Sequence, residues 1–459
     1  MKDKNISNEK SQSPQSPQSP QSPQSPQSQI SRRNFVKNTA IGTAAVGLSP
    51  LVFPSLASAQ AAAGKKKLKV GVVGLGGRGS GAVRDILSAD PDTILWAAGD
   101  LFENRLKGIP KYEKSFPGRI DTDGGKREFV GFDAYQKVID SGADIILLTT
   151  TPAFRPQHFA AAVAAGKHVF IEKPFALDIP GLKSVQESAK KAKSNGQSVL
   201  TGLVWRYSTH LMEMHKRIQD GAIGDVLSTS SMYCAGGRPN KMPDIKFKPP
   251  TMSDMEWAQR YWQNFIELGG DGTLEYMIHG IDRMSWAMGD KMPVKCFANG
   301  GNIVPVPGAN AWDNFSIRYE YADGRTADFF GRQIPRTYAG GSDEIIGTKG
   351  RASCNGKTAS IIIDGKTTWE QKGGLGYVNE HKIFTEHIRK GKVFNDVIDQ
   401  FDITHAIVIM GREAAYTGQM ITDKQLMGST KNLIKTEGMD FKTPFTAMPS
   451  PVPGTTKFI

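Results

Sequence analysis

Three polar side chains suited to acid–base chemistry recur at helical spacing in the second half of the chain. Glu275, His279 and Asp282 stand at positions i, i+4 and i+7, which predicts that they share one face of a helix. Oxidation of an alcohol by hydride transfer needs a base that removes the hydroxyl proton while the carbon-bound hydrogen faces the hydride acceptor. We expect His279 to be that base and Glu275 to orient it or share the proton.

Two other interpretations fit the same three residues. Glu275, His279 and Asp282 could converge on a metal ion, because all three residue types are metal ligands. Alternatively, His279 is a structural histidine that donates to Asp282. No further ligand cluster adjoins them, and the cysteines Cys234, Cys296 and Cys354 are far apart and odd in number. We therefore expect no metal site and no disulfide framework.

A glycine-rich segment earlier in the chain could bind phosphate. Gly74, Gly76 and Gly79 follow directly after the β-branched run 68–73 and precede a helix-compatible segment. Such glycines allow a tight turn, a close approach of the backbone to a pyrophosphate and close packing of helix on strand, while the helix N-terminus supplies N–H donors. This context predicts a dinucleotide-binding turn.

Asp100 is the candidate ribose ligand. It ends the next predicted strand, 93–98, about twenty residues past the glycines, where an acid accepts the ribose hydroxyls and repels a 2′-phosphate. The position favours NAD over NADP, with NADP as the other possibility. Alternatively, Asp100 caps the helix that follows.

The elements that must position these residues read as an α/β protein with two parts. Predicted strands 144–148 and 168–171 flank a helix over 156–165, an alternation that indicates a parallel sheet and a Rossmann domain over 66–200. Later, 314–321 and 326–330 predict a hairpin of an antiparallel sheet. We expect a C-terminal α/β substrate domain over 201–430 and a tail over 431–459.

Several motifs together resemble one family. The glycine turn, Thr150-Thr151-Pro152 followed by His158, Ala-Gly-Lys-His-Val at 165–169 and Glu172-Lys173-Pro174 resemble the glucose–fructose oxidoreductase/inositol dehydrogenase (Gfo/Idh/MocA) family. The resemblance runs from about Lys67 to about Ala447. It implies a Rossmann domain followed by an α/β domain whose largely antiparallel open sheet covers the nicotinamide and forms a dimer or tetramer.

The resemblance also assigns site residues. In the family the lysine of the Glu-Lys-Pro motif touches the substrate hydroxyl and the nicotinamide, which makes Lys173 a catalytic candidate whose ammonium would lower the hydroxyl pKa. The family usually has aspartate where this chain has Glu275, which is one methylene longer. The expected cofactor contacts are Gly74, Gly76, Gly77, Arg78, Gly79, Asp100, Thr150, Pro152, His158, Glu172 and Lys173.

Aromatic rings beside hydrogen-bonding groups suit sugar rings, so we expect Trp262 and Tyr377 to contact a carbohydrate. Arg206 and Asp282 are the polar substrate candidates, and His381 could reach the same cleft. Each of these residues could instead be structural.

The first sixty residues predict a targeting signal rather than a folded domain. A Ser-Pro-Gln repeat over 11–29 has no apolar side chains to bury and is expected to be disordered. Arg32-Arg33, a weakly apolar stretch over 39–56 and Ala57-Ser58-Ala59 then form the three parts of a twin-arginine export signal. We expect cleavage after Ala59 and delivery of the folded protein to the periplasm by the twin-arginine translocase, as in an exported subgroup of the family.

Composition narrows the function. The net charge is +12, but basic residues are scattered, so no nucleic-acid partner is expected, and no apolar run is long enough for a membrane span. An exported compartment is not expected to hold soluble nicotinamide nucleotides, so the cofactor should stay bound. The expected function is a sugar or polyol oxidoreductase. The alternatives are an NAD-dependent glycoside hydrolase or lyase that uses transient sugar oxidation and elimination, and a non-catalytic, cofactor-stabilised binding protein.

Overall fold

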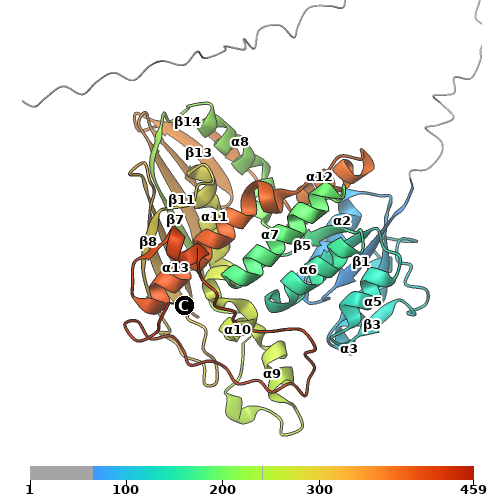
Figure 1. The fold of residues 1–459 in the computed structure, drawn as a ribbon. Coiled ribbons are helices and arrows are strands. Elements are labelled where there is room, and N and C mark those ends of the chain that lie inside the picture. Colours follow the sequence, from blue (N-terminus) through green and yellow to red (C-terminus); the bar gives the residue numbers. More distant parts are fainter. Residues whose placement is uncertain (1–65, 240, 459) are drawn as a thin grey trace, which may run out of the picture. The chain divides into compact units, whose positions relative to one another are not determined.

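A parallel sheet of six strands organises the N-terminal part of the computed structural model, which describes residues 66–239 and 241–458 (Figure 1). The strand order is β3-β2-β1-β4-β5-β6, the arrangement of a Rossmann fold. Its strands are β1 (Leu68–Val73), β2 (Thr93–Asp100), β3 (Glu128–Val130), β4 (Ile145–Leu148), β5 (His168–Ile171) and β6 (Val199–Thr201). The predicted Rossmann fold is confirmed, and the export-signal prediction lies outside the described residues.

Helices cover both faces of this sheet, which explains the near-continuous apolar character of its strands. All four residues of β4 are buried, as are Val70, Val72 and Val73 of β1. The helices are α2 (Gly77–Ala89), α3 (Glu103–Leu106), α4 (Pro110–Glu113), α5 (Ala134–Asp140), α6 (Arg155–Ala164) and α7 (Ile179–Ser194), with the 3₁₀ turn η1 (Pro152–Phe154) before α6.

The C-terminal part is built on a nine-stranded sheet of order β14-β13-β12-β11-β7-β10-β9-β8-β15. Neighbouring strands are antiparallel except for β7 and β10, and the predicted hairpin is present as β9 and β10, with Glu320 opposite Thr326. The strands are β7 (Val226–Ala235), β8 (Lys295–Gly301), β9 (Asn314–Glu320), β10 (Thr326–Gln333), β11 (Gly340–Gly347), β12 (Arg351–Cys354), β13 (Thr358–Ile363), β14 (Lys366–Lys372) and β15 (Ile421–Thr422).

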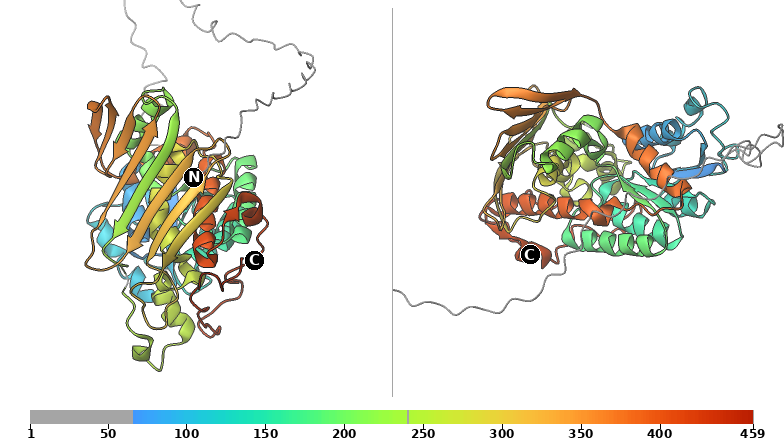
Figure 2. Two further views of the ribbon diagram at one scale, coloured as in Figure 1. Left: turned by 90° about the vertical axis from the view of Figure 1, so that its left-hand side faces the viewer. Right: turned by 90° about the horizontal axis from the view of Figure 1, so that it is seen from above.

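One face of this sheet is covered by helices and the other is open (Figure 2). In β9, Phe315, Ile317 and Tyr319 point into the core, in alternation with exposed residues. The helical elements of this part are η2 (Val204–Tyr207), α8 (Thr209–Gln219), η3 (Ile245–Phe247), α9 (Asp254–Arg260), η4 (Trp262–Asn264), α10 (Ile266–Gly269), η5 (Thr273–Met277), α11 (Ile278–Ala287), α12 (Tyr377–Arg389), η6 (Val397–Phe401), α13 (Asp402–Thr417) and α14 (Asp423–Met427).

The chain returns to the first sheet after completing the second. Phe384 of α12 is buried in the core beside α2, together with Val70 and Leu147 of the parallel sheet. Farther on, the Leu433 backbone amide donates to Asp178 Oδ2 at 2.9 Å, and Leu433 and Met439 are buried. Both α12 and the segment predicted as a C-terminal tail therefore also pack on the Rossmann part, and the division at 200/201, which falls within β6, stays a prediction. None of the described helices is long and apolar enough to cross a membrane.

Candidate active site

The glycine turn after β1 has the backbone that a dinucleotide requires. Gly74 has φ of +93°, and a Cβ at Gly79 would lie 1.8 Å from the Gly74 carbonyl oxygen, so both positions need glycine for the turn itself. A Cβ at Gly76 or Gly77 would meet nothing within 4 Å. Gly76 is the N-cap of α2, so open space lies beside the N-terminus of this helix, where a pyrophosphate is stabilised.

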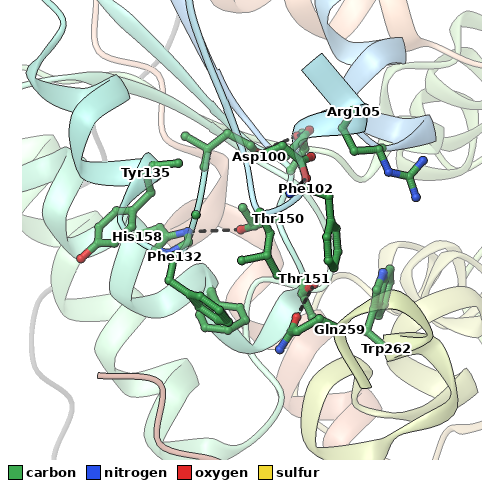
Figure 3. Close-up of a pocket in the computed structure, with 18 of the residues that line it drawn as sticks. Asp100, Phe102, Arg105, Phe132, Tyr135, Thr150, Thr151, His158, Gln259 and Trp262 are labelled. Carbon is green, nitrogen blue, oxygen red and sulfur yellow. Dashed lines mark hydrogen bonds between the residues drawn. The ribbon is translucent and has the colours of Figure 1, made fainter. Parts of the chain in front are cut away.

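A cavity of about 310 Å³ opens at the carboxyl edge of the parallel sheet (Figure 3). Its Rossmann wall includes Gly74, Gly76, Asp100, Thr150 and His158, all predicted cofactor contacts. Its other wall comes from the C-terminal part, through residues 259–262. The volume lies in the range of small-molecule sites, and the turn, helix N-terminus and acid fit a nicotinamide dinucleotide.

Asp100 ties the glycine turn to the loop after β2. Its Oδ2 accepts from the Leu75 amide at 2.6 Å and its Oδ1 from the Phe102 amide at 2.9 Å. Burial raises its pKa, against the lowering effect of these amides. Because α3 begins at Glu103 with Phe102 as its N-cap, Asp100 is not the helix cap. Each carboxylate oxygen keeps acceptor capacity for a ribose hydroxyl.

His158 forms a neutral, rigid part of the cavity wall. Its Nδ1 lies 3.2 Å from Thr150 Oγ1, and its ring stacks on Tyr135 at 4.0 Å (Figure 3). Burial, together with the charge of Arg155, lowers its pKa to about 3. Pro152 does not line this cavity. It begins η1 and lines a separate one with Asp178, so the prediction of a cofactor contact there is not supported.

Arg78 and Glu172 form an ion pair. Arg78 Nε donates to Glu172 Oε1 at 2.5 Å, and its Nη1 donates to Asp85 at 2.8 Å. Only 3% of the Glu172 side chain is exposed, so its carboxylate is occupied by Arg78, and the cofactor contact expected of Glu172 stays a prediction. The Arg78 guanidinium lies 4.5 Å from the Tyr377 ring, so the half-buried Tyr377, expected to contact substrate, packs on Arg78.

The structure brings Lys173 and Glu275 together from the two parts of the chain. Lys173 follows β5, and its Nζ donates to the backbone carbonyl of Glu275 in η5. His279 stands four residues beyond Glu275 on the same helical run. Burial lowers the Lys173 pKa, although Glu275 and Glu172 act to raise it. The predicted association of these residues is therefore present in the fold.

His279 is held in its neutral form. Burial first, and then the positive charges of Lys173 and Arg283, place its pKa well below 6.5. Its Nδ1 is buried and has no hydrogen-bond partner within residues 66–239 and 241–458. A neutral imidazole at this position can accept a proton, whereas an imidazolium could not.

Comparison with known proteins fits this geometry. A family model described as an oxidoreductase family with an NAD-binding Rossmann fold (GFO_IDH_MocA) matches residues 68–199, and the model of the GFO/IDH/MocA C-terminal domain matches residues 211–353. The chain belongs to the Gfo/Idh/MocA family. It is an oxidoreductase, and its cofactor is NAD.

Proteins similar to this chain are named for different activities. Myo-inositol 2-dehydrogenase of Thermotoga maritima is 24% identical over 349 residues, which cover 71% of this chain and 89% of that protein. A glycosyl hydrolase family 109 protein of Streptomyces coelicolor is 24% identical over 233 residues, or 49% of this chain and 44% of that protein. The structure of GenD2 from gentamicin A biosynthesis, solved in complex with NAD, matches this chain with a TM-score of 0.59 at 20% identity. The match covers 78% of this chain and 96% of GenD2, which shows a shared fold.

Two predicted substrate contacts of this Gfo/Idh/MocA protein are instead structural. Arg206 Nη2 lies 2.8 Å from Asp282 Oδ1 and 2.7 Å from Asp290 Oδ1, with 3% of the Arg206 and 1% of the Asp282 side chain exposed. Thr404 Oγ1 also donates to Asp282. Asp282 therefore belongs to a buried ion pair, which corrects the expectation that it contacts substrate. Its oxygens are hydrogen-bonded to Arg206 and Thr404, so the described residues do not support a metal site shared with Glu275 or a hydrogen bond from His279.

The reason for the error is a change of helical pitch. Glu275 lies in η5, a π-helical turn with wider spacing than the α-helix that begins at Ile278. The i, i+4, i+7 rule assumes one continuous α-helix, so it does not hold across the junction between Glu275 and Asp282. His381 is likewise buried, with its ring 4.6 Å from Phe170, and does not reach the cleft.

Two glutamines complete the site and were missed from the sequence. Gln263 Nε2 donates to Glu275 Oε1 at 2.8 Å, and Gln259 faces Thr151 at 3.3 Å (Figure 3). Trp262, expected to contact substrate, lines the nucleotide cavity between them. Gln263 adjoins Trp262 in η4, but no spacing rule relates it to Glu275, because the contact depends on how η4 packs against η5.

Proposed function

We propose that this protein oxidises a sugar or sugar-like polyol by hydride transfer to an NAD that remains bound. The observation that carries the proposal is the convergence of Lys173 with the helical run of Glu275 and His279, next to a cradle that fits a dinucleotide. A binding protein without turnover would not need a neutral histidine and a buried lysine at the same place.

When bound, NAD supplies the hydride acceptor. His279, held neutral by burial and by the charge of Lys173, takes the proton of the substrate hydroxyl. The Lys173 ammonium, fixed by the Glu275 carbonyl, stabilises the negative charge that develops on the substrate oxygen. Gln263 orients the Glu275 carboxylate, which accepts or shares a proton beside them.

The substrate class rests on the surroundings of His279 and on one relative. Tyr233 lies 6.0 Å from the His279 ring and 4.7 Å from the Tyr276 ring, which provides aromatic surface and hydroxyl groups for a ring-shaped polyol. The match to a myo-inositol 2-dehydrogenase points to the same class.

A second candidate function is net glycoside cleavage. Oxidation at one sugar carbon acidifies the neighbouring C–H, so a base can remove that proton and the glycosidic oxygen can leave, after which water adds and the ketone is reduced by the same bound cofactor. The match to a glycosyl hydrolase family 109 protein supports this alternative. Both candidates use His279 and Lys173.

We also propose that the protein is exported with its cofactor in place. The twin-arginine pattern from Arg32 to Ala59 supports export of a folded chain. An NAD that stays bound would then be regenerated on the protein, either within one glycoside cycle or by a second carbonyl substrate.

Association through the open face of the nine-stranded sheet is a further part of the proposal. Leu227, Phe297, Phe330 and Ile346 are exposed on β7, β8, β10 and β11, between 36% and 50% each. Sedimentation of the wild type against a Phe330→Glu variant tests it, and an unchanged monomer mass in both would refute it.

The function is tested with purified mature protein. Bound nucleotide is released and identified, and the loaded protein is then mixed with inositols, aldoses and aryl glycosides while NADH absorbance and aglycone release are followed. NADH formation without aglycone supports the oxidoreductase, whereas aglycone release with only transient NADH supports the glycosidase. Absence of bound nucleotide, with no thermal shift on adding NAD, would refute both.

A further inference from the structure

Residues 431–448, close to the end of the described chain, are here termed the C-terminal strap. It runs from the Rossmann helices to the C-terminal part, along the dark red trace in Figure 1. The Leu433 amide donates to Asp178 at the start of α7, and Thr436 Oγ1 donates to Gln157 of α6 at 2.9 Å. At its other end the Met448 amide donates to Glu267 of α10 at 2.5 Å. The strap is therefore anchored to both parts of the chain.

The middle of the strap packs behind the Rossmann wall of the nucleotide cavity. The Phe441 ring lies 5.8 Å from Phe102 in a stacked arrangement and 5.0 Å from Phe132 in an edge-to-face arrangement. Phe102 and Phe132 both line the cavity (Figure 3). Phe441 itself is not part of the lining, so it supports the wall from outside.

The strap reaches the opposite wall through its neighbouring residues. The Phe445 ring packs edge-on to the Phe265 ring at 5.2 Å. Phe265 lies three residues after the 259–262 segment, which lines the cavity. Met439 shares a buried cluster with Met255 of α9 and with Phe154, another residue of the cavity lining. The strap therefore packs directly on the Rossmann wall and, through Phe265 and Met255, on the elements that flank the opposite wall, so parting of the two walls would strain its contacts.

We propose that the C-terminal strap is a clasp that retains the nucleotide, with Phe441 as the residue that positions Phe102 and Phe132. This inference rests on the proposed function with a bound NAD and adds the segment that keeps it bound. Release of a nucleotide from between two walls requires the walls to part, so contacts that join them slow dissociation more than they change the chemistry. Phe441 is a positioning residue and not a catalytic one.

The test compares Phe441→Ala and Phe441→Tyr with a matched phenylalanine control. Phe247, on η3, is 67% exposed and belongs to neither wall of the cavity, so Phe247→Ala removes a ring without touching the strap. Each protein is loaded with radiolabelled NAD and chased with unlabelled NAD, and its thermal midpoint is recorded. We expect Phe441→Ala to release NAD about tenfold faster, because two aromatic pairs are lost.

The controls separate retention from folding. Phe441→Tyr keeps both ring contacts and should release NAD within about twofold of wild type, as should Phe247→Ala. A Phe441→Ala protein that lowers the thermal midpoint but releases NAD at the wild-type rate would overturn the clasp and leave the proposed function standing. A wild type that binds no NAD at all would instead overturn the proposed function, and the clasp with it.

Discussion

The buried arginine of the C-terminal part gives a prediction that separates a structural from a substrate-binding role. Arg206→Met removes the guanidinium that bridges Asp282 and Asp290 and leaves Asp282 buried with only the Thr404 hydroxyl as a donor from a side chain of the described residues. Removal of one partner of a buried ion pair costs about 3–5 kcal/mol of unfolding free energy. That is a large share of the roughly 5–15 kcal/mol that hold a domain folded.

The assay is urea unfolding followed by tryptophan fluorescence, with Arg217→Met as the control. Arg217 pairs with Glu213 at 2.9 Å, but 41% and 36% of the two side chains are exposed, so its loss should cost no more than about 1 kcal/mol. The Arg206→Met deficit should shrink as the pH falls, because the unpaired Asp282 can then be protonated without cost. A stable Arg206→Met protein, within about 1 kcal/mol of wild type but with a raised KM, would refute the structural role and restore Arg206 as a substrate contact.

Three further predictions follow from the glycine turn, the catalytic histidine and a buried acid. Gly76→Ala should fold, because a Cβ at this position meets nothing within 4 Å, but it should bind NAD more weakly in calorimetry. In Gly79→Ala the Cβ would lie 1.8 Å from the Gly74 carbonyl oxygen, so this variant should not yield folded protein on gel filtration. The acid limb of the hydride-transfer rate should lie well below pH 6.5, since His279 loses its base function only when protonated and its pKa is lowered; a limb centred near pH 6.5 in stopped-flow measurements would contradict this. Burial raises the Asp396 pKa to about 7, so the unfolding free energy should fall as the pH rises from 3.8 toward 7. Asp396→Asn should remove this dependence of the unfolding free energy on pH, as measured by urea titrations at several pH values. An unchanged dependence in the variant would show that other groups cause it.

Local rules were enough to predict the parts of the site that lie next to each other in sequence. The glycine turn, Asp100 and the strand–helix alternation of the Rossmann sheet each depend on short-range spacing, and the structure places them as expected. Alternation of polar and apolar residue types in the sequence likewise predicted the β9–β10 hairpin. Short-range periodicity determines these features, so they can be read without knowing the tertiary fold.

The rest depends on contacts between distant segments. The partner of Asp282 is Arg206, which lies 76 residues earlier, and the π-helical turn η5 cannot be recognised from the spacing of Glu275, His279 and Asp282. The role of the segment after 430 is equally long-range, because its apolar residues could cover any surface until the fold places Phe441 on Phe102. Gln263 is recognisable only once η4 and η5 are side by side.

The most direct test of the central claim is a single-turnover measurement on protein loaded with NAD. Wild type, Lys173→Met and His279→Asn are loaded, their bound nucleotide is quantified, and each is mixed rapidly with a polyol that the wild type accepts while NADH absorbance is followed. The account predicts equal nucleotide content in all three proteins and rapid NADH formation in the wild type, with a rate reduced by at least about a hundredfold in both variants. NADH formation at the wild-type rate in His279→Asn would contradict the assignment of His279 as the base and, with it, the proposed catalytic arrangement.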